Sequence, residues 1–217
     1  MSQYLIHTFP SRLWYVEGYL IPSMRAQGIT DEQIIVYNDK NRDGELISFL
    51  KSLEATKDKD IWHIQDDVII SSKFKEVTET HNEGIVCGFC NSYSTGQSGT
   101  VLVWDMWYSM PCIRIPSSIA QHFLTWMRSP EVNKKYQNYF RDNKHDDIFL
   151  QFFLRENYAT MRVENIAPNI VNHIDYLIGG SLINKDRPKT IPETMSSYWE
   201  EPQLLDDIAN RLGINKG

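Results

Sequence analysis

Apolar residues cluster in three strand-like stretches of the N-terminal third, and between them they recur at the helical period. The strand-like stretches begin at residues 4, 33 and 61 ("YLIHTF", "QIIVYND" and "IWHIQDD"), and the helical patterns span residues 12–27 and 44–55. A spacing of about 30 residues per strand and helix is typical of a βαβ unit, whose right-handed crossover makes successive strands parallel. The first third of the chain is therefore predicted to be βαβαβ.

Each helical pattern predicts an inward face. The expected inward residues are Leu13, Val16, Leu20 and Met24 in the first helix and Ile47, Leu50 and Leu53 in the second. Pro22 should kink the first helix, and Gly28 should end it.

The rest of the chain shows more elements of both kinds but no clear second domain. We expect strands at 84–89, 101–107 and 112–116, helices at 117–128 and 145–157, and then a strand, a loop that ends at His173 and a Gly-Gly-Ser turn. Ser117 or Ser118 should cap the first of these helices, with Ile119, Phe123, Trp126 and Met127 inward. The predicted fold is α/β, a single Rossmann-like domain around a mostly parallel sheet, followed by a tail with a short helix near 203–212.

Polar side chains collect where the three predicted parallel strands end. These residues are His7, Thr8 and Ser11, then Asn38 and Asp39, then Asp66 and Asp67. Ligands of open α/β sheets bind outside the carboxyl ends of the strands, so this edge is the expected site. The first turn, "HTFPSRLW", has no glycine, which argues against a dinucleotide fingerprint or a P-loop.

Asp66 and Asp67, which we call the acidic pair, interrupt an otherwise apolar stretch, "DIWHIQDDVIISS". Burying an unpaired carboxylate costs several kcal/mol, and no Lys or Arg lies near in the sequence. Two interpretations are open at this point: the pair binds a divalent cation, or one Asp caps a turn and the other is solvated.

Composition and charge indicate which broad class of protein the chain belongs to: globular or not, membrane-spanning or not, and attracted to polyanions or not. The chain has 217 residues, 41% of them hydrophobic, with a net charge of −6 and a pI near 5.5, so it can bury a core but has no overall attraction for nucleic acid or anionic membranes. The sequence has neither a secretory-signal layout nor an apolar run of about 20 residues, and it has three cysteines. Cys87 and Cys90 form a C-x-x-C in a strand-like run, where residues three apart point to opposite faces, so plain core and surface cysteines are expected. These features favour a soluble cytoplasmic protein with no membrane span.

Other polar residues have both an ordinary and a functional interpretation. His173 is either a histidine satisfied near the core or a ligand, and Asp146 and Asp147 are either helix N-caps or acids of a site. The segment 91–100, "NSYSTGQSGT", is either a solvated loop or a lid that orders over a ligand.

In their order along the chain these motifs resemble a nucleotide-sugar glycosyltransferase of the A-type fold. The similar features are "QDDV" after the third strand, "HDDIFL" at a helix start, "PNIVNHID" and the following "GGSLIN". The chain resembles the lipooligosaccharide-type glycosyltransferases (family 25), and short bacteriophage-encoded glycosyltransferases, whose start is similar to its "HTFPSRLWY", look more similar still. A phage-encoded protein would act in the host cytoplasm. Gln65 departs from the acid that opens the family's triplet, and "HTFPSR" departs from its first loop.

The resemblance implies an architecture and a set of roles. It implies a glycosyltransferase domain over 1–184, with a nucleotide-sugar-binding half (1–90) and an acceptor-side half (91–184), and a C-terminal tail over 185–217. Asp67 and His173 would bind Mn²⁺ or Mg²⁺, and Asp146 or Asp147 would be the general base if the reaction inverts. The donor nucleotide sugar would be held by Thr8, Pro10, Arg12, Asp39, Asp66 and Ser181.

The predicted function is metal-dependent transfer of a sugar from a nucleoside-diphosphate sugar, such as a UDP-sugar, to a hydroxyl acceptor. The acceptor is a glycan or lipid-linked sugar, or a hydroxylated base of phage DNA, as in DNA modification. Candidate stacking residues are Trp104, Trp107, Tyr108 and Trp126, and a candidate basic rim consists of Lys134, Lys135, Arg141 and Lys144. The alternatives are a non-catalytic nucleotide-binding module and a metal-dependent nucleotidyl- or phosphotransferase.

Overall fold

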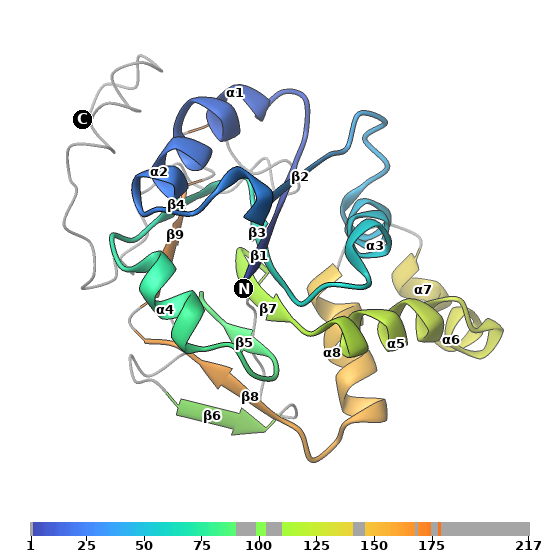
Figure 1. The fold of residues 1–217 in the computed structure, drawn as a ribbon. Helices are drawn as coiled ribbons and strands as arrows, with labels where there is room; N and C mark the ends of the chain where they lie inside the picture. The colour runs from blue at the N-terminus through green and yellow to red at the C-terminus, as the bar shows by residue number, and fades with distance from the viewer. Residues whose placement is uncertain are drawn as a thin grey trace, which may run out of the picture.

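The computed structural model describes residues 2–89, 99–102, 110–140, 146–167, 169–174 and 178, and it has α/β architecture (Figure 1). Its strands are β1 (Gln3–Thr8), β2 (Ile34–Asn38), β3 (Ile61–Gln65), β4 (Val68–Ile70), β5 (Val86–Cys87), β6 (Gly99–Leu102), β7 (Cys112–Ile115), β8 (Arg162–Asn165) and β9 (Val171–His173). Its α-helices are α1 (Leu13–Tyr15), α2 (Ile21–Ala26), α3 (Glu45–Thr56), α4 (Phe74–Thr80), α5 (Ser117–Met127), α6 (Pro130–Lys135), α7 (Gln137–Phe140) and α8 (Asp146–Asn157). A π-helix, η1 (Val16–Leu20), joins α1 to α2, and a 3₁₀-helix, η2 (Asp31–Gln33), precedes β2.

The central sheet has seven strands in the order β2-β1-β3-β7-β5-β8-β6. The first three strands are parallel, which confirms the predicted βαβαβ unit, whereas β7 runs antiparallel to both of its neighbours. β8 is parallel to β5, and β6 is antiparallel to β8, so five of the seven strands point the same way. The α/β class and a mostly parallel sheet are therefore present in the described residues.

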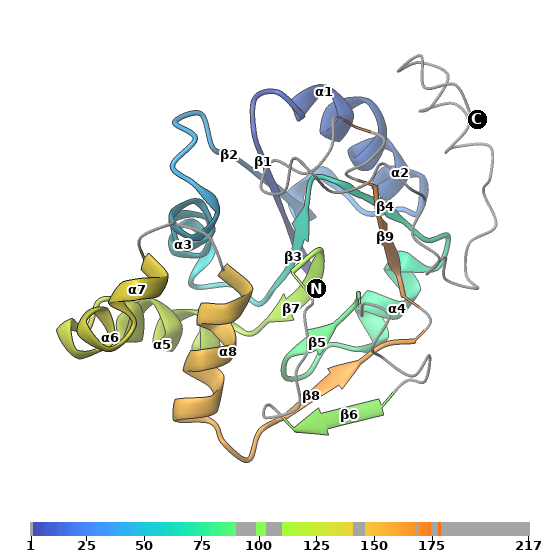
Figure 2. The same cartoon turned by 180° about the vertical axis from the view of Figure 1, so that it is seen from behind.

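Helices cover both faces of this sheet (Figures 1 and 2). Side chains along β1 alternate between the two cores. Leu5 faces the core that includes α3, α5 and α8, whereas Tyr4 and Ile6 face the core that includes η1, α2 and α4. By the same alternation His7 lies on the α3 side, where it meets Ser48, and Thr8 lies on the side of α1.

Val16, Leu20 and Met24 of the predicted inward face of the first helical segment are fully buried, whereas Leu13 is half-buried. The π-helix ends directly before α2, which has Pro22 in its first turn. Proline has no N–H to donate. The wider π turn lies just before Pro22, so the missing N–H of this proline costs no α-helical hydrogen bond. Gly28 ends the segment with φ +77°.

Two helix details differ from the sequence-based expectation. In α3 the buried apolar residues are Leu46, Phe49 and Leu53, and Ile47, which was expected to face inward, is 42% exposed. Only Ile47 was wrong among the three expected residues: Leu53 is fully buried and Leu50 packs, partly buried, against the same core, to which Leu46 and Phe49 also belong. In α5 neither serine caps the helix; instead Asp60 Oδ1 accepts the Ser117 N–H at 2.8 Å.

A second sheet, with two strands, begins directly after the acidic pair. The stretch expected to be one strand breaks at Asp66 and Asp67, and the chain continues as β4, which pairs antiparallel with β9. His173, expected at the end of a loop, is instead the last residue of β9 and lies opposite Val68. In both views β4 and β9 run side by side next to α2 (Figures 1 and 2).

Several predicted features lie outside the described residues. They are Cys90, most of segment 91–100, most of the predicted strand at 101–107 with Trp104, Trp107 and Tyr108, the residues Arg141, Lys144 and Ser181, and the tail after 185 with its helix near 203–212. Among the helices that are described, none combines the length and hydrophobicity needed to cross a membrane.

Candidate functional site

The acidic pair forms a turn at the carboxyl end of β3, next to the carboxyl end of β1. Asp66 is 2% exposed and Asp67 is 8% exposed, so neither carboxylate is solvated. The pair is enclosed from one side by the turn that follows β1 and from the other by β9. The acids therefore need partners from within the protein.

Arg12 supplies the positive charge. Its Nη1 lies 2.8 Å from Asp66 Oδ1 and 2.7 Å from Asp67 Oδ2, and the residue is only 4% exposed. The expectation that no Lys or Arg is near the pair holds in the sequence but not in space. Neither the metal nor the solvated-turn interpretation anticipated this ion pair.

The turn after β1 places Arg12. Pro10 occupies the second position of a tight turn closed by the Arg12 N–H, which donates to Phe9 O at 2.9 Å; proline favours that position because its φ is already fixed. α1 starts at the next residue, and the Tyr15 hydroxyl donates to Val68 O at 2.8 Å, which ties the helix to β4.

Asp66 has donors for both of its oxygens. Oδ1 accepts from Arg12, and Oδ2 accepts from Thr8 Oγ1 at 2.8 Å and from the Phe9 N–H at 3.3 Å. Burial, and then the neighbouring Asp67 carboxylate, raise the pKa of Asp66 to about 6 against the opposing effect of Arg12. Thr8 is fully buried, so its hydroxyl orients Asp66, and the nucleotide contact expected of Thr8 has no exposed atom to use.

Asp67 is held differently. Its Oδ2 accepts from Arg12 and lies 3.1 Å from His173 Nε2, whereas its buried Oδ1 has no hydrogen-bond partner among the described residues. Burial favours the neutral acid, but His173 and Arg12 outweigh it, and the pKa of Asp67 is well below its usual range. Backbone bonds support the contact, because the Ile174 N–H donates to Asp67 O at 2.7 Å.

The predicted approach of His173 to Asp67 is therefore present, although the two are far apart in the sequence. A divalent cation fits this pair in a limited sense. Asp67 has one unused carboxylate oxygen, Oδ1, and its other oxygen lies beside the His173 imidazole; a carboxylate and an imidazole form a donor set that suits Mn²⁺. No cluster of three or more His, Cys, Asp or Glu side chains suited to a metal occurs in the described part of the chain. Phosphate and water oxygens would have to complete such a site, as they commonly do for Mg²⁺.

The edge of the sheet continues from the acidic pair to the loop after β2. Asp39 is 2% exposed, its N–H donates to Thr8 O, and its Oδ2 accepts the Asp43 N–H at 2.8 Å, so Asp39 shapes this loop. His7 Nε2 lies 2.5 Å from Ser48 Oγ. Burial lowers the pKa of His7 to about 4 despite the carboxylates of Asp39 and Asp67.

The two acids of α8 differ from one another. Asp146 is 2% exposed, its Oδ1 accepts the Asp147 N–H, and its buried Oδ2 has no hydrogen-bond partner among the described residues. Burial, and then Glu45 at the start of α3, raise the pKa of Asp146 well above its usual range. Asp147 is only half-buried, and its Oδ1 accepts the Ile148 N–H at 2.7 Å.

The remaining candidates fall in the core or on the surface. Trp126 is 9% exposed and stacks with Phe123, so it is a core residue. Lys135 pairs with Glu156, and Lys134 is exposed on α6. Pro10 and Ser11 are exposed at the turn after β1.

Sequence reasoning missed the contact of Arg12 with the acids and the anchoring role of Tyr15. A signal for the first was present, because Arg12 follows β1 by four residues and β1 is the neighbour of β3 in a βαβαβ unit. In comparisons with known proteins, neither the models of protein families nor the curated protein sequences gave a match to this chain.

Proposed function

We propose that this protein is a metal-dependent glycosyltransferase that moves a sugar from a nucleoside-diphosphate sugar to a hydroxyl acceptor. One observation carries the proposal: His173 lies 3.1 Å from Asp67, whose second oxygen is buried without a partner among the described residues. A histidine and a carboxylate at the carboxyl edge of a parallel sheet are placed where such folds bind their ligands.

The donor side of the site consists of groups that hold charge in place. Asp67 and His173 would bind the cation, and Thr8 and the Phe9 N–H would keep Asp66 oriented beside it. A bound Mn²⁺ or Mg²⁺ would offset the negative charge that develops on the departing nucleoside diphosphate.

On the acceptor side we assign proton removal to Asp147. Asp146 is buried beside Glu45, so it holds its proton more firmly than an ordinary carboxyl group, whereas Asp147 is half-buried at the first turn of α8. A carboxylate that is ionised at neutral pH can accept the proton of an acceptor hydroxyl during transfer.

A thermal-shift panel tests the donor assignment. Nucleoside diphosphates, nucleotide sugars and nucleoside triphosphates are each added with and without Mn²⁺. Mn²⁺-dependent stabilisation by one nucleotide sugar, followed by sugar transfer to a glycan or to DNA containing hydroxymethylated bases, is the expected result. Stabilisation without any transfer favours a binding module, and turnover of triphosphates favours a nucleotidyl- or phosphotransferase.

A matched set of variants tests the acceptor assignment. Asp147→Asn keeps the size of the side chain but cannot accept a proton, so we expect the transfer rate to fall by about 10²- to 10⁴-fold with donor binding unchanged. Asp31→Asn, at an exposed position in η2, controls for the substitution itself. If the loss falls on Asp146→Asn instead, the two roles are exchanged; if neither variant is slower, α8 carries no base.

A further inference from the structure

Arg12 is the cation of the acidic pair, and it serves both carboxylates through a single nitrogen. Nη1 lies 2.8 Å from Asp66 Oδ1 and 2.7 Å from Asp67 Oδ2. Two adjacent carboxylates that are almost wholly buried repel each other strongly, and a positive charge between them makes their burial tolerable. The protein therefore carries a positive charge of its own at the place where the proposed function puts a metal ion.

The two carboxylates depend on Arg12 to different degrees. Asp66 has Thr8 and the Phe9 N–H as further donors, so it stays oriented if the guanidinium moves. On Asp67 the guanidinium shares Oδ2 with His173, and Oδ1 has no hydrogen-bond partner in the described chain. A second cation could be bound by Asp67 and His173, but the first would then stand within a few ångströms of it.

We infer that Arg12 is an exchangeable counter-ion: it occupies Asp67 when no donor is bound, and it leaves Asp67 when the metal and the diphosphate enter. The inference rests on the proposed function and deepens it. A dication and a guanidinium bound to the same carboxylate repel each other, so Arg12 must turn away, and a diphosphate offers the planar guanidinium a bidentate partner. Arg12 lies in the turn before α1, where its side chain can rotate without breaking a helical hydrogen bond.

The exchange has a thermodynamic consequence. While Arg12 occupies Asp67, a metal ion alone must compete with it and binds weakly. A diphosphate draws Arg12 away and so strengthens metal binding, which couples the two ligands. Removing the guanidinium should therefore strengthen the binding of metal alone, the opposite of what loss of a purely structural residue would do.

The test measures Mn²⁺ binding without nucleotide, by electron paramagnetic resonance of free Mn²⁺. We expect Arg12→Gln to bind Mn²⁺ at least about 10-fold more tightly than the wild-type protein, a change of about 1.4 kcal/mol. Arg114→Gln is the matched control, because Arg114 is also buried (6% exposed) and ion-paired, but with Asp60 at the other end of β3. It should leave Mn²⁺ binding unchanged.

The outcomes separate this inference from the proposed function. If wild-type protein binds Mn²⁺ with a nucleotide of the panel but Arg12→Gln gains no affinity for Mn²⁺ alone, the exchange is refuted and the proposed function stands. If no Mn²⁺ binds to either protein under any condition, the metal assignment fails, and the exchange fails with it.

A measurement on the wild-type protein covers the case in which Arg12→Gln does not fold. In a crystal structure with Mn²⁺ and UDP, Arg12 Nη1 should lie beyond hydrogen-bond distance of Asp67 Oδ2, more than about 3.5 Å away. Mn²⁺ bound to Asp67 with Arg12 still in place would overturn the exchange. An Asp67 that binds no Mn²⁺ in these crystals would reject it together with the metal assignment.

Discussion

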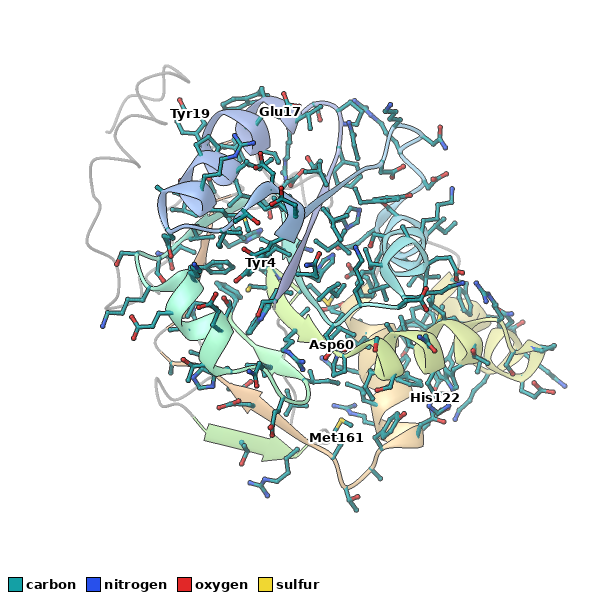
Figure 3. All side chains as sticks on the ribbon, in the orientation of Figure 1. Tyr4, Glu17, Tyr19, Asp60, His122 and Met161 are labelled. Atoms are coloured by element: carbon teal, nitrogen blue, oxygen red, sulfur yellow. The ribbon has the colours of Figure 1, made fainter. Side chains whose placement is uncertain are left out.

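Acids at each end of β3 pair with an arginine, but the two ion pairs differ in burial and in how many carboxylate oxygens are hydrogen-bonded. At the amino end, Asp60 pairs with Arg114 on β7 at 2.8 Å; at the carboxyl end, the acidic pair shares Arg12. Asp60 lies low in the molecule beside β7 and α5, far from Glu17 and Tyr19 of the helical segment that follows Arg12 (Figure 3).

The amino-end pair is complete and hydrated. The Asp60 side chain is 52% exposed, its Oδ1 accepts the Ser117 N–H, and Arg114 Nη1 donates to Gly84 O. The Ser117 N–H is the main cause of a lowered pKa of Asp60. These contacts join β3, β7 and α5 and leave both Asp60 oxygens bonded, as expected of an ion pair that stabilises the fold.

The carboxyl-end cluster is buried and incomplete, because two carboxylates share one guanidinium nitrogen and one oxygen has no partner among the described residues. Natural proteins rarely keep such groups without a use, since an unsatisfied buried oxygen costs free energy. The contrast teaches that an acid's unused bonding capacity, rather than its charge or its arginine, distinguishes a candidate site from a structural ion pair.

The largest predicted effect concerns His63, midway along β3. His63 is fully buried, and burial, with a smaller contribution from His7, lowers its pKa to about 3 from 6.5. The unfolded chain binds this proton near pH 6.5 and the folded chain only near pH 3, so stability falls as pH falls between these values. Over this whole pH interval the loss from His63 amounts to about 5 kcal/mol, from 1.36 kcal/mol per pKa unit.

His63→Leu should remove that part of the acid sensitivity. Urea denaturation of wild type and variant between pH 7 and 4 measures the difference in slope. His122→Gln, at an exposed position on α5, controls for the replacement of a histidine. Equal slopes for His63→Leu and wild type would show that protonation of His63 does not cause the acid sensitivity.

The second prediction compares the two ends of β3 by their effect on nucleotide binding. Asp67→Asn should weaken Mn²⁺-dependent binding of the donor nucleotide by at least about 100-fold, about 2.8 kcal/mol, because an amide is a poor ligand for the cation. Asp60→Asn should leave that binding unchanged. Calorimetry with and without Mn²⁺ provides the comparison, and equal affinities for both variants would remove the carboxyl end of β3 from the site.

Much of the fold follows from local pattern, and the parts that do not follow depend on distant partners. β1, β2 and β3 with their crossover helices were predictable because each is long enough to show its period. β4 and β9 were not, since each has three residues and is defined by pairing with the other. The short helices α4, α6 and α7 were missed for a similar reason: they are too short to show a helical period.

In the candidate site too, some features could be predicted from the sequence and others could not. The position of Asp66 and Asp67 at the ligand edge follows from topology alone. The contact with His173 was expected only from the family resemblance, and the contact with Arg12 was not expected at all. Side-chain direction after a turn depends on packing, here on Tyr15 against β4, which no pattern in the sequence reveals.

The third prediction compares two buried threonines: Thr8 at the carboxyl end of β1, and Thr78 on α4, which contacts Tyr4 near the amino end of β1. Thr8 Oγ1 donates to the Asp66 carboxylate at 2.8 Å, whereas Thr78 Oγ1 meets the neutral Tyr4 hydroxyl at 2.8 Å. A hydrogen bond to a charged group contributes more, so Thr8→Val should lower the free energy of unfolding by about 2 kcal/mol and Thr78→Val by about 1 kcal/mol. Urea denaturation at pH 7 measures both, and a larger loss for Thr78→Val would mean that Thr8 does little to hold Asp66.

The smallest effect is expected at Asp60, where the contrast between the two ends of β3 can be tested most directly. Asp60→Asn keeps an oxygen that can accept the Ser117 N–H and removes only the charge that pairs with Arg114. Because the Asp60 side chain is half-exposed, water replaces much of what the ion pair supplied, and the free energy of unfolding should fall by less than about 1 kcal/mol. Asp60→Ala also loses the cap of α5 and should cost about 1 kcal/mol more.

Arg114 remains bonded to Gly84 O in both variants, which is why neither should leave a buried charge without a partner. A loss of about 3 kcal/mol for Asp60→Asn, measured by urea denaturation, would mean that Arg114 depends on this carboxylate as a buried pair does. The two ends of β3 would then differ in exposure alone, and the unused oxygen of Asp67 would have to support the functional assignment without that contrast.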